Sequence, residues 1–517
     1  MKRNSRLYNS LLNVGTTAVV TLLSMILSMV VRSALNRSLG TDYVGLNGVL
    51  TSVISSLSIA DLGVDSVFVY LLYKPMADHD REEIDKLMVL FKRVYLIIGS
   101  FFLLLGIACI PFLKYLVGHQ AMSFPHVRLI FFIFLLNTGL SYFFAAYRII
   151  LNADQRYYII ARVTFIITVT TNLLQIAGLL FIKSFVLYSF LLLFNTVTTN
   201  LILGRLAIRR YGLRRLPKEH LRNLKFKNDK TVSTLVHNTI GGISNKLGGI
   251  FVNSSDNILL ANFETLKIVG MYSNYLLVTN AVTSLLSKVL ASLTATVGNL
   301  GAEGNERKNL DTFLKLTSMM NILVILCVIP MALFFGAFVN LWVGGNNILP
   351  ELATMLIVIN CMLSVARYPA LTFIDAFGLQ WIQRWKSIVE SAVNIGVALF
   401  LLIVFKMGLV GVLLGTLCSN LLVVNWYEPY LVLREACGRH YREFIQQLIP
   451  AVVLFVLALA FSAAILHSGI LGVSVWKSLA MIAVAELCLL AAILVFLRKN
   501  SGVQFIFRIF RRFTSKN

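Results

Sequence analysis

Long apolar runs separated by short polar stretches dominate this chain of 517 residues. A run of about 20 apolar residues is long enough to cross a bilayer as a helix, and about fourteen such runs predict as many transmembrane helices. The longest connection is too short to hold a soluble catalytic domain. The predicted spans cover residues 9–34, 45–72, 94–113, 126–147, 158–182, 184–204, 233–262, 269–298, 316–339, 351–374, 387–405, 409–433, 447–467 and 473–497.

The two halves of this pattern resemble each other. Short motifs recur in the same order at one offset of roughly 220 residues, which shared apolar composition does not produce. We therefore predict an all-α integral membrane protein of two six-helix repeats and a C-terminal helix pair, with the substrate site between the repeats. The matched positions are Val44 with Val269, Ile110 with Ile329, Asn137 with Asn360, and Asn172 with Asn394.

These repeats suggest boundaries. Residues 1–210 are predicted to form an N-terminal lobe of helices one to six, and residues 233–440 a C-terminal lobe of helices seven to twelve. Residues 211–232 form a basic cytosolic linker, and residues 441–517 carry the last two helices and an amphipathic basic tail. Apolar stripes that start at Ile84 and at Leu310 indicate interfacial helices at equivalent places of the two repeats.

Composition supports a membrane protein. The chain is 58% hydrophobic and 13% charged, with a mean hydropathy of +0.80. The net charge of +23 does not indicate nucleic acid, because most of the 46 Lys and Arg residues lie in alternate loops and tails. This bias places both termini in the cytosol. The six cysteines are scattered and suggest neither disulfides nor a metal site.

Four basic residues fall inside predicted spans. A charge in the bilayer is costly, so each is a candidate ligand-binding group, although snorkelling to the interface explains a basic residue near a span end equally well. Lys246 lies between glycines in GGISNKLGG, where a ligand could approach closely. The four candidates for binding an anionic substrate are Arg32, Lys246, Lys288 and Arg367.

Acidic residues also fall inside spans. Arg32 and Asp256 occupy nearly equivalent places in the two repeats, and we hypothesise that they pair across the outer mouth when the cavity faces inward. Asp61 could pair with an embedded cation or carry a coupling proton or sodium ion. Glu390 and Glu486 are embedded as well. Sugar contacts are expected at polar span positions, namely Asn137, Asn172, Gln175, Asn253 and Asn360.

Enzyme signatures are weak. Asp78-His79-Asp80 matches an acid-x-acid metal pattern, but acidic residues at a helix start explain it better. The histidines lack ligand spacing, and no phosphate-cradling loop is present. We predict no enzymatic activity, no catalytic or metal site and no cofactor.

Several stretches resemble a known family. RSLGTDYVGLNGVLTSVISSLSIADLGVDSVFVYLLYKPMADHDREEIDKL, SSDNILLANFETLKIVGMYSNYL, TATVGNL and WYEPYLVLREACG are similar to segments of bacterial flippases for lipid-linked polysaccharide repeat units, the Wzx-like members of the multidrug/oligosaccharidyl-lipid/polysaccharide exporter superfamily. The resemblance covers residues 1 to 440. It implies a V-shaped pair of six-helix lobes in the bacterial cell membrane, surrounded by membrane lipids.

The resemblance also implies a substrate. That substrate would be a glycan on undecaprenyl diphosphate, moved from the inner to the outer leaflet with possible proton or sodium coupling. The added helix pair resembles that of lipid II flippases, where it forms a groove for the lipid tail. Three alternatives stay open: a cation-coupled multidrug exporter of the same superfamily, a membrane polymerase or glycosyltransferase, and a scaffold without transport activity.

Overall fold

The computed structural model describes residues 6–58, 64–154, 156–213, 254–291, 304–469 and 475–496, together with 294, 297, 298 and 300. Within this part the regular elements are all helices. Their Cα positions group into two compact units, Met1–Gly270 and Met271–Asn517. The predicted linker lies mostly outside the described residues, so the predicted lobe boundaries stay predictions.

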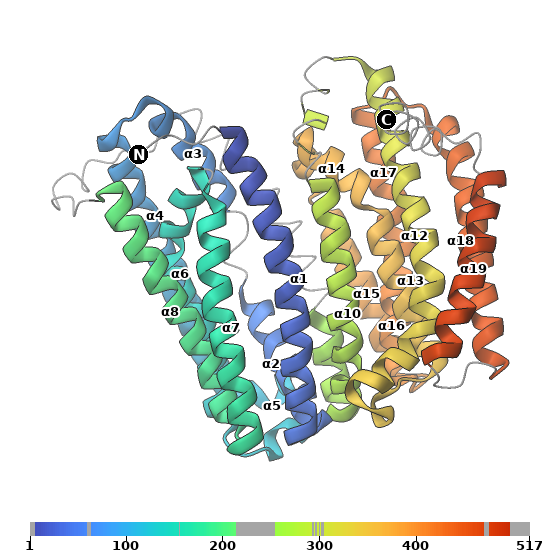
Figure 1. The fold of residues 1–517 in the computed structure, drawn as a ribbon, viewed down its shortest axis with the longest axis horizontal. Helices are drawn as coiled ribbons and strands as arrows, with labels where there is room; N and C mark the ends of the chain where they lie inside the picture. The colour runs from blue at the N-terminus through green and yellow to red at the C-terminus, as the bar shows by residue number, and fades with distance from the viewer. Residues whose placement is uncertain are drawn as a thin grey trace. The chain divides into compact units, whose positions relative to one another are not determined.

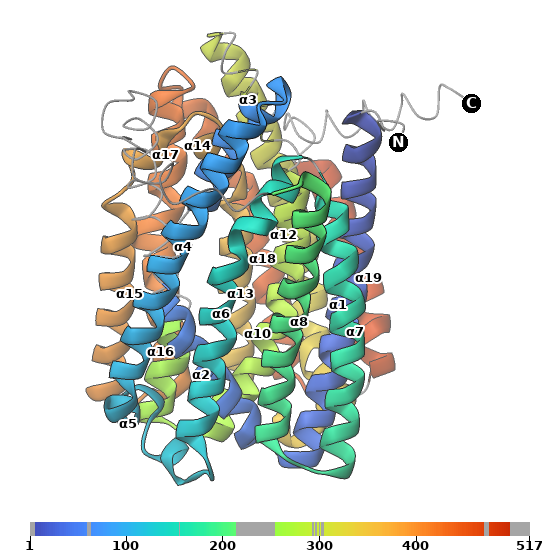
Figure 2. The ribbon, with the colours of Figure 1, turned by 90° about the vertical axis from the view of Figure 1, so that its left-hand side faces the viewer.

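The first unit is a bundle in which neighbouring helices follow the order α4, α6, α8, α7 and α1 (Figures 1 and 2). Segment 254–270, which the sequence assigns to the second lobe, belongs to this unit. The elements are α1 (Arg6–Leu39), α2 (Thr41–Leu57), α3 (Val64–Asp78), α4 (Arg81–Cys109), α5 (Leu113–Val117), α6 (Val127–Ala153), α7 (Tyr157–Phe181), α8 (Phe185–Tyr211), a helix at 254–263 and the start of α10 (Leu266–Ala291).

In the second unit the long helix α12 packs against α13 on the one hand and against both α18 and α19 on the other. The added helix pair is therefore docked on this unit. The elements after α10 are α12 (Glu306–Val343), α13 (Glu351–Ala366), α14 (Tyr368–Ala376), α15 (Lys386–Ile403), α16 (Gly408–Ser419), a π-helix (Asn420–Val424), α17 (Asn425–Glu435), α18 (Tyr441–His467) and α19 (Val475–Phe496).

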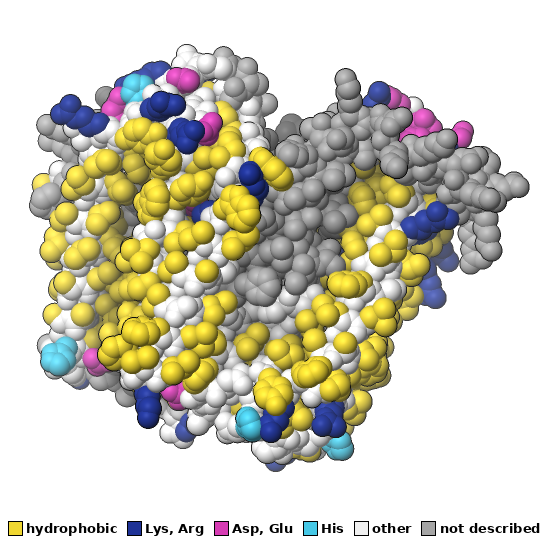
Figure 3. Space-filling model, turned by 180° about the vertical axis from the view of Figure 1, so that it is seen from behind, with side chains coloured by type: hydrophobic (Ala, Val, Ile, Leu, Met, Phe, Trp, Pro, Cys, Tyr) yellow, Lys and Arg dark blue, Asp and Glu magenta, His cyan; other side chains and the backbone are white. Residues whose placement is uncertain are grey.

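The surface fits a bilayer. Eleven helices of the described part are long and apolar enough to cross a membrane. Ile97 and Leu104 on α4 leave 69% and 67% of their surface exposed, as a lipid-facing helix requires. On the face seen in Figure 3, apolar side chains cover the flanks of the helices and charged ones gather at their ends. The chain is a multi-pass membrane protein, while the count of fourteen helices stays a prediction.

Helix starts in the two halves agree with the offset seen in the sequence. α2 starts at Thr41 and α10 at Leu266, and α4 starts at Arg81 and α12 at Glu306; each pair is separated by 225 positions. The caps agree as well, because Asp80 accepts a hydrogen bond from Glu83 N and Asn305 accepts one from Lys308 N. The six-plus-six layout stays a prediction that these starts support.

The predicted interfacial helices are not separate elements. Both apolar stripes lie on the first turns of long helices that continue toward the opposite ends of their units, α4 and α12. Their side chains are buried in the bundles. Phe91 and Phe313 are 0% and 1% exposed. Both segments are amphipathic helices, as the periodicity predicts, but their apolar side faces neighbouring helices instead of the headgroups.

Two repeat-related glycines let α2 and the start of α10 cross with their backbones nearly in contact. A Cβ atom on Gly45 would lie 2.0 Å from Leu266 O, and one on Gly270 would lie 2.1 Å from Thr41 O. The contact is reciprocal, since each glycine meets the carbonyl four residues before the other. A buried hydrogen bond of 2.9 Å from Asn257 Nδ2 to Ser52 Oγ fastens the preceding helix to α2.

Gly45→Ala should destabilise this crossing, because its methyl group cannot fit against a backbone oxygen. Overpacking of this kind costs about 1–3 kcal/mol. Thermal unfolding of the purified protein in detergent measures the loss. The matched control is Gly396→Ala on α15, where no atom lies within 4 Å of the added Cβ and helix propensity favours alanine. Equal melting temperatures for the two variants would contradict the tight crossing.

Candidate functional site

The predicted site residues fall into two groups. Lys246 and Asp61 lie outside the described residues, and Lys288 lies on α10 with a side chain that is not described. Their roles therefore stay predictions. Arg32 and Asp256 belong to the first unit and Arg367 to the second, and each can be examined by itself.

Arg32 is a cation inside the first bundle. It lies on α1, half-buried, close enough to Tyr188 of α8 for an electrostatic interaction. The backbone oxygen of Tyr188 accepts a 3.2 Å hydrogen bond from Gln175 Nε2 of α7. The Arg32 Nη1 atom is shielded from solvent and has no hydrogen-bond partner among the described residues. A guanidinium has five donors, so Arg32 retains capacity for an anionic ligand.

Other polar atoms of this unit have the same unmet capacity. In the described part, no hydrogen bond reaches Asn137 Oδ1 on α6, Thr171 Oγ1 on α7 or either amide atom of Asn200 on α8. Thr171 and Asn200 are 1% exposed. Buried polar groups are normally hydrogen-bonded to protein or water. The interior of the first unit is therefore suited to water or to a polar ligand.

Asp256 does not neutralise Arg32. It lies in the helix at 254–263 and is 6% exposed, within the same unit as Arg32. Among the described residues no ion pair joins the two side chains. Arg32 therefore has no carboxylate at ion-pair distance among the described residues, and its pairing with Asp256 across the outer mouth stays a prediction.

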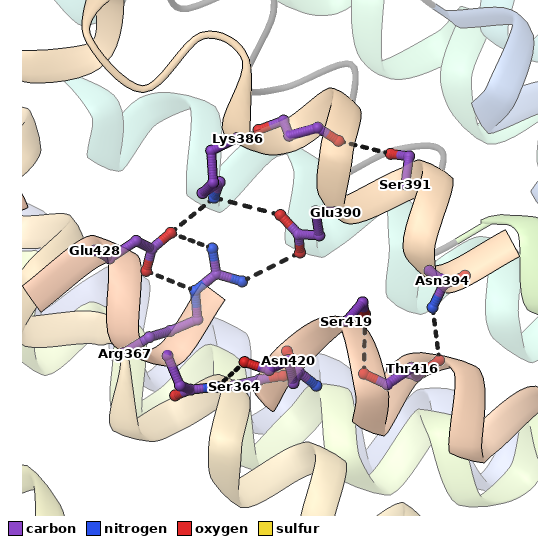
Figure 4. A network of polar contacts seen from close by, with 12 residues as sticks. Ser364, Arg367, Lys386, Glu390, Ser391, Asn394, Thr416, Ser419, Asn420 and Glu428 are labelled. Carbon is purple, nitrogen blue, oxygen red and sulfur yellow. Dashed lines mark hydrogen bonds and ion pairs between the residues drawn. The ribbon is translucent and has the colours of Figure 1, made fainter. Parts of the chain in front are cut away.

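Arg367 has a different environment, a buried cluster of four charges (Figure 4). Arg367 donates to both carboxylate oxygens of Glu428, through Nε at 3.0 Å and through Nη2. Lys386 Nζ donates to the same Glu428 carboxylate at 2.7 Å. Glu390 lies beside both cations, 3.6 Å from Arg367 Nη1 and 3.3 Å from Lys386 Nζ. The cluster holds two positive and two negative charges and is neutral.

Local structure brings these four side chains together. Arg367 sits at the junction of α13 and α14, where Pro369 follows at the start of the new helix. Lys386 and Glu390 are four residues apart and share one face of α15. Glu428 lies on α17, directly after the π-helix, an insertion that often marks functional sites. The cluster thus connects three helices of the second unit.

Sequence reasoning found only part of this cluster. Arg367 is predicted from the sequence to bind an anionic substrate, whereas in the structure it contacts the carboxylates of Glu428 and Glu390, as Lys386 does. Glu428 was not considered, although it lies in the quoted motif WYEPYLVLREACG. An embedded acid between aromatic residues and Pro429 is the signal that could have found it.

Comparison with known proteins identifies the family. The sequence matches the family described as "Polysaccharide biosynthesis protein" over residues 10–297, more than half of the chain. The chain belongs to this family. No curated protein sequence matches it.

The polysaccharide biosynthesis protein also shares its fold with solved transporters. An inward-facing multidrug resistance transporter of the MATE family, in the MOP superfamily, aligns with a TM-score of 0.60 and 14% identity, over 81% of this chain and 100% of that one. Lipid II flippase MurJ in an inward closed conformation gives a TM-score of 0.57 and 12% identity, over 88% and 99%. Eukaryotic MATE transporter AtDTX14 gives 0.57 and 14%, over 88% and 98%. At these identities the likeness establishes the fold.

Glu428→Gln should strongly destabilise the polysaccharide biosynthesis protein, because it leaves two cations facing one carboxylate. Breaking a buried ion pair on one side costs about 3–5 kcal/mol. Adding Arg367→Met should recover part of this loss, since Lys386 and Glu390 then balance each other. Thermal unfolding in detergent compares these variants with the control Glu435→Gln, whose side chain is 29% exposed. If the double variant were less stable than Glu428→Gln, the lost charge balance would not explain the destabilisation by Glu428→Gln.

Proposed function

We propose that this protein is a flippase that moves undecaprenyl-diphosphate-linked oligosaccharide repeat units from the inner to the outer leaflet by alternating access. It would act in the bacterial cell membrane, with both termini in the cytosol, in the assembly of capsule, exopolysaccharide or another surface polysaccharide. It would bind no cofactor and catalyse no covalent reaction. A proton or sodium ion could reset the empty carrier through Asp61 or Asp256.

One observation carries the proposal. A member of a polysaccharide biosynthesis family contains, inside its first bundle, an arginine that has no carboxylate at ion-pair distance among the residues that the structure describes. Arginine binds phosphate through a planar fork of donors and keeps its charge at any physiological pH. The diphosphate of the carrier lipid would be the counter-ion of Arg32. Lys246 and Lys288 are proposed as further contacts with the same group.

The membrane potential fits this direction of transport. Moving one charge through 100 mV changes the free energy by roughly 2.3 kcal/mol. Outward movement of a group with about two negative charges is therefore favourable by approximately 4–5 kcal/mol in a membrane that is negative inside. Glycan passage needs polar surroundings, and Asn137, Thr171 and Asn200 offer polar atoms that have no hydrogen-bond partner among the described residues.

Arg32→Ala should raise the apparent KM for the glycolipid at least about tenfold, because a hydrogen bond to a charged group contributes roughly 1.5–3 kcal/mol. Arg32→Lys should recover part of the affinity, since it keeps the charge but loses the fork. Purified protein in liposomes, loaded with a short undecaprenyl-diphosphate oligosaccharide, gives the rate at which glycan reaches the far leaflet. The control is Arg37→Ala, an exposed arginine on the same helix.

The outcomes separate the site from the function. If the wild type transfers glycan and Arg32→Ala transfers it equally well, the protein is a flippase but Arg32 is not part of its binding site. A wild-type protein that moves no glycan but extrudes cationic dyes along a cation gradient would be a multidrug exporter. A wild-type protein that extends glycan chains without moving them would be a polymerase.

A further inference from the structure

We propose that Glu390 is an internal counter-ion, seated on an anion-binding site formed by Arg367 and Lys386, and that the diphosphate of the substrate displaces it. The inference rests on the proposed function for the identity of the ligand. It concerns the second unit and is separate from Arg32.

The two carboxylates of the cluster are held very differently. Glu428 is 0% exposed and receives three short hydrogen bonds, two from Arg367 and one from Lys386. Glu390 is 7% exposed, and its described contacts are the two ion pairs at 3.6 and 3.3 Å. Glu428 is therefore a fixed part of the cluster, and Glu390 is a weakly held one.

The atoms that face Glu390 form a complete anion site. Arg367 uses Nε and Nη2 for Glu428, which leaves Nη1 free of that pair and 3.6 Å from Glu390 Oε1. Lys386 Nζ gives one hydrogen bond to Glu428 and faces Glu390 with its remaining donors. Each carboxylate oxygen of Glu390 lies beside one cation. A phosphate oxyanion can use the same donors, and with better geometry, since it is not tied to α15.

Charge counting gives this site a selectivity. Arg367, Lys386 and Glu428 together carry one positive charge, and Glu390 brings the total to zero. A phospholipid headgroup with one negative charge could replace Glu390, but the total charge of the site would again be zero. The replacement would therefore gain no attraction and would cost Glu390 its two ion pairs. A diphosphate carries at least two charges and gains additional attraction in a medium of low dielectric constant. Glu390 therefore favours diphosphates over the singly charged lipids that surround the protein.

The position of the cluster suits the loading of substrate. α13 ends at the junction with Arg367, and α15 begins with Lys386, so the cluster lies at one end of the second unit. The sequence predicts this end to be cytosolic, because loops on that side are rich in basic residues. Arg367 is the most exposed member, at 16%. A glycolipid in the inner leaflet would meet this cation at headgroup depth.

The test is a binding titration of the full-length chain, with inorganic pyrophosphate as probe in detergent and with undecaprenyl diphosphate or phosphatidylglycerol as probe in nanodiscs. Glu390→Gln removes the competing charge and should raise the pyrophosphate affinity about tenfold. Phosphatidylglycerol affinity should rise as well, so that discrimination between the two lipids falls. Adding Arg367→Gln should abolish both gains. Glu435→Gln, in an ion pair outside the cluster, is the control and should match wild type.

Glu390→Asp is a second variant, which keeps the charge and withdraws it from the cations. It should raise the pyrophosphate affinity about two- to threefold. If Glu390→Gln does not fold, this variant alone tests whether Glu390 competes with the anion. Unchanged or weaker pyrophosphate binding by the folded variants would overturn the proposal. A gain with pyrophosphate but not with undecaprenyl diphosphate would assign the site to a free diphosphate. If Glu390→Gln raises the pyrophosphate affinity but the wild type moves no glycolipid, the proposed flippase function is wrong and the anion-binding site is still supported.

Discussion

Neutralisation of charge inside the bilayer is the constraint on which the second unit depends. An ionised side chain in a medium of low dielectric constant must have a counter-charge or water beside it. Arg367 meets this demand through Glu428, which lies on a different helix 61 residues away. The break between α13 and α14 and the π-helix before α17 accompany this contact. The breaks in the helices of this unit therefore lie beside the charged residues that pair with each other.

The first unit meets the same constraint differently. Arg32 has no carboxylate at ion-pair distance among the described residues, and its unit also contains buried amide and hydroxyl groups with unmet hydrogen-bonding capacity. In the second unit the corresponding amides are engaged, since Asn360 donates to Leu413 O and Asn394 donates to Thr416 Oγ1. Both units also contain buried polar atoms without a hydrogen-bond partner among the described residues, for example Asn200 in the first unit and Asn274 in the second. The units differ in their buried arginines, because Arg367 contacts two carboxylates and Arg32 has none at ion-pair distance among the described residues. This difference is the physical reason to propose ligand binding at Arg32.

Local patterns predicted the helices well, and long-range contacts not at all. The apolar runs identified the spanning helices, and the offset of the repeats agrees with the starts of α10 and α12. The apolar stripe at Phe91 was assigned to the membrane surface because periodicity does not reveal which neighbour covers it. The Arg367–Glu428 pair joins two spans whose packing is set by tertiary structure. The sequence shows Arg367 and Glu428 as charged residues inside predicted spans, but it does not show that they pair.

A carrier must also release what it binds. A site that holds an anion with an uncompensated positive charge in a low-dielectric medium would bind strongly and release slowly, whereas transport requires binding that is favourable and still reversible. A carboxylate poised at 3.3 to 3.6 Å from both cations of the cluster lowers the net attraction and is available to take the place of a departing ligand. Glu390 supplies this carboxylate on α15, one helical turn from Lys386, and this i,i+4 spacing allows it to return to its cation when the ligand departs.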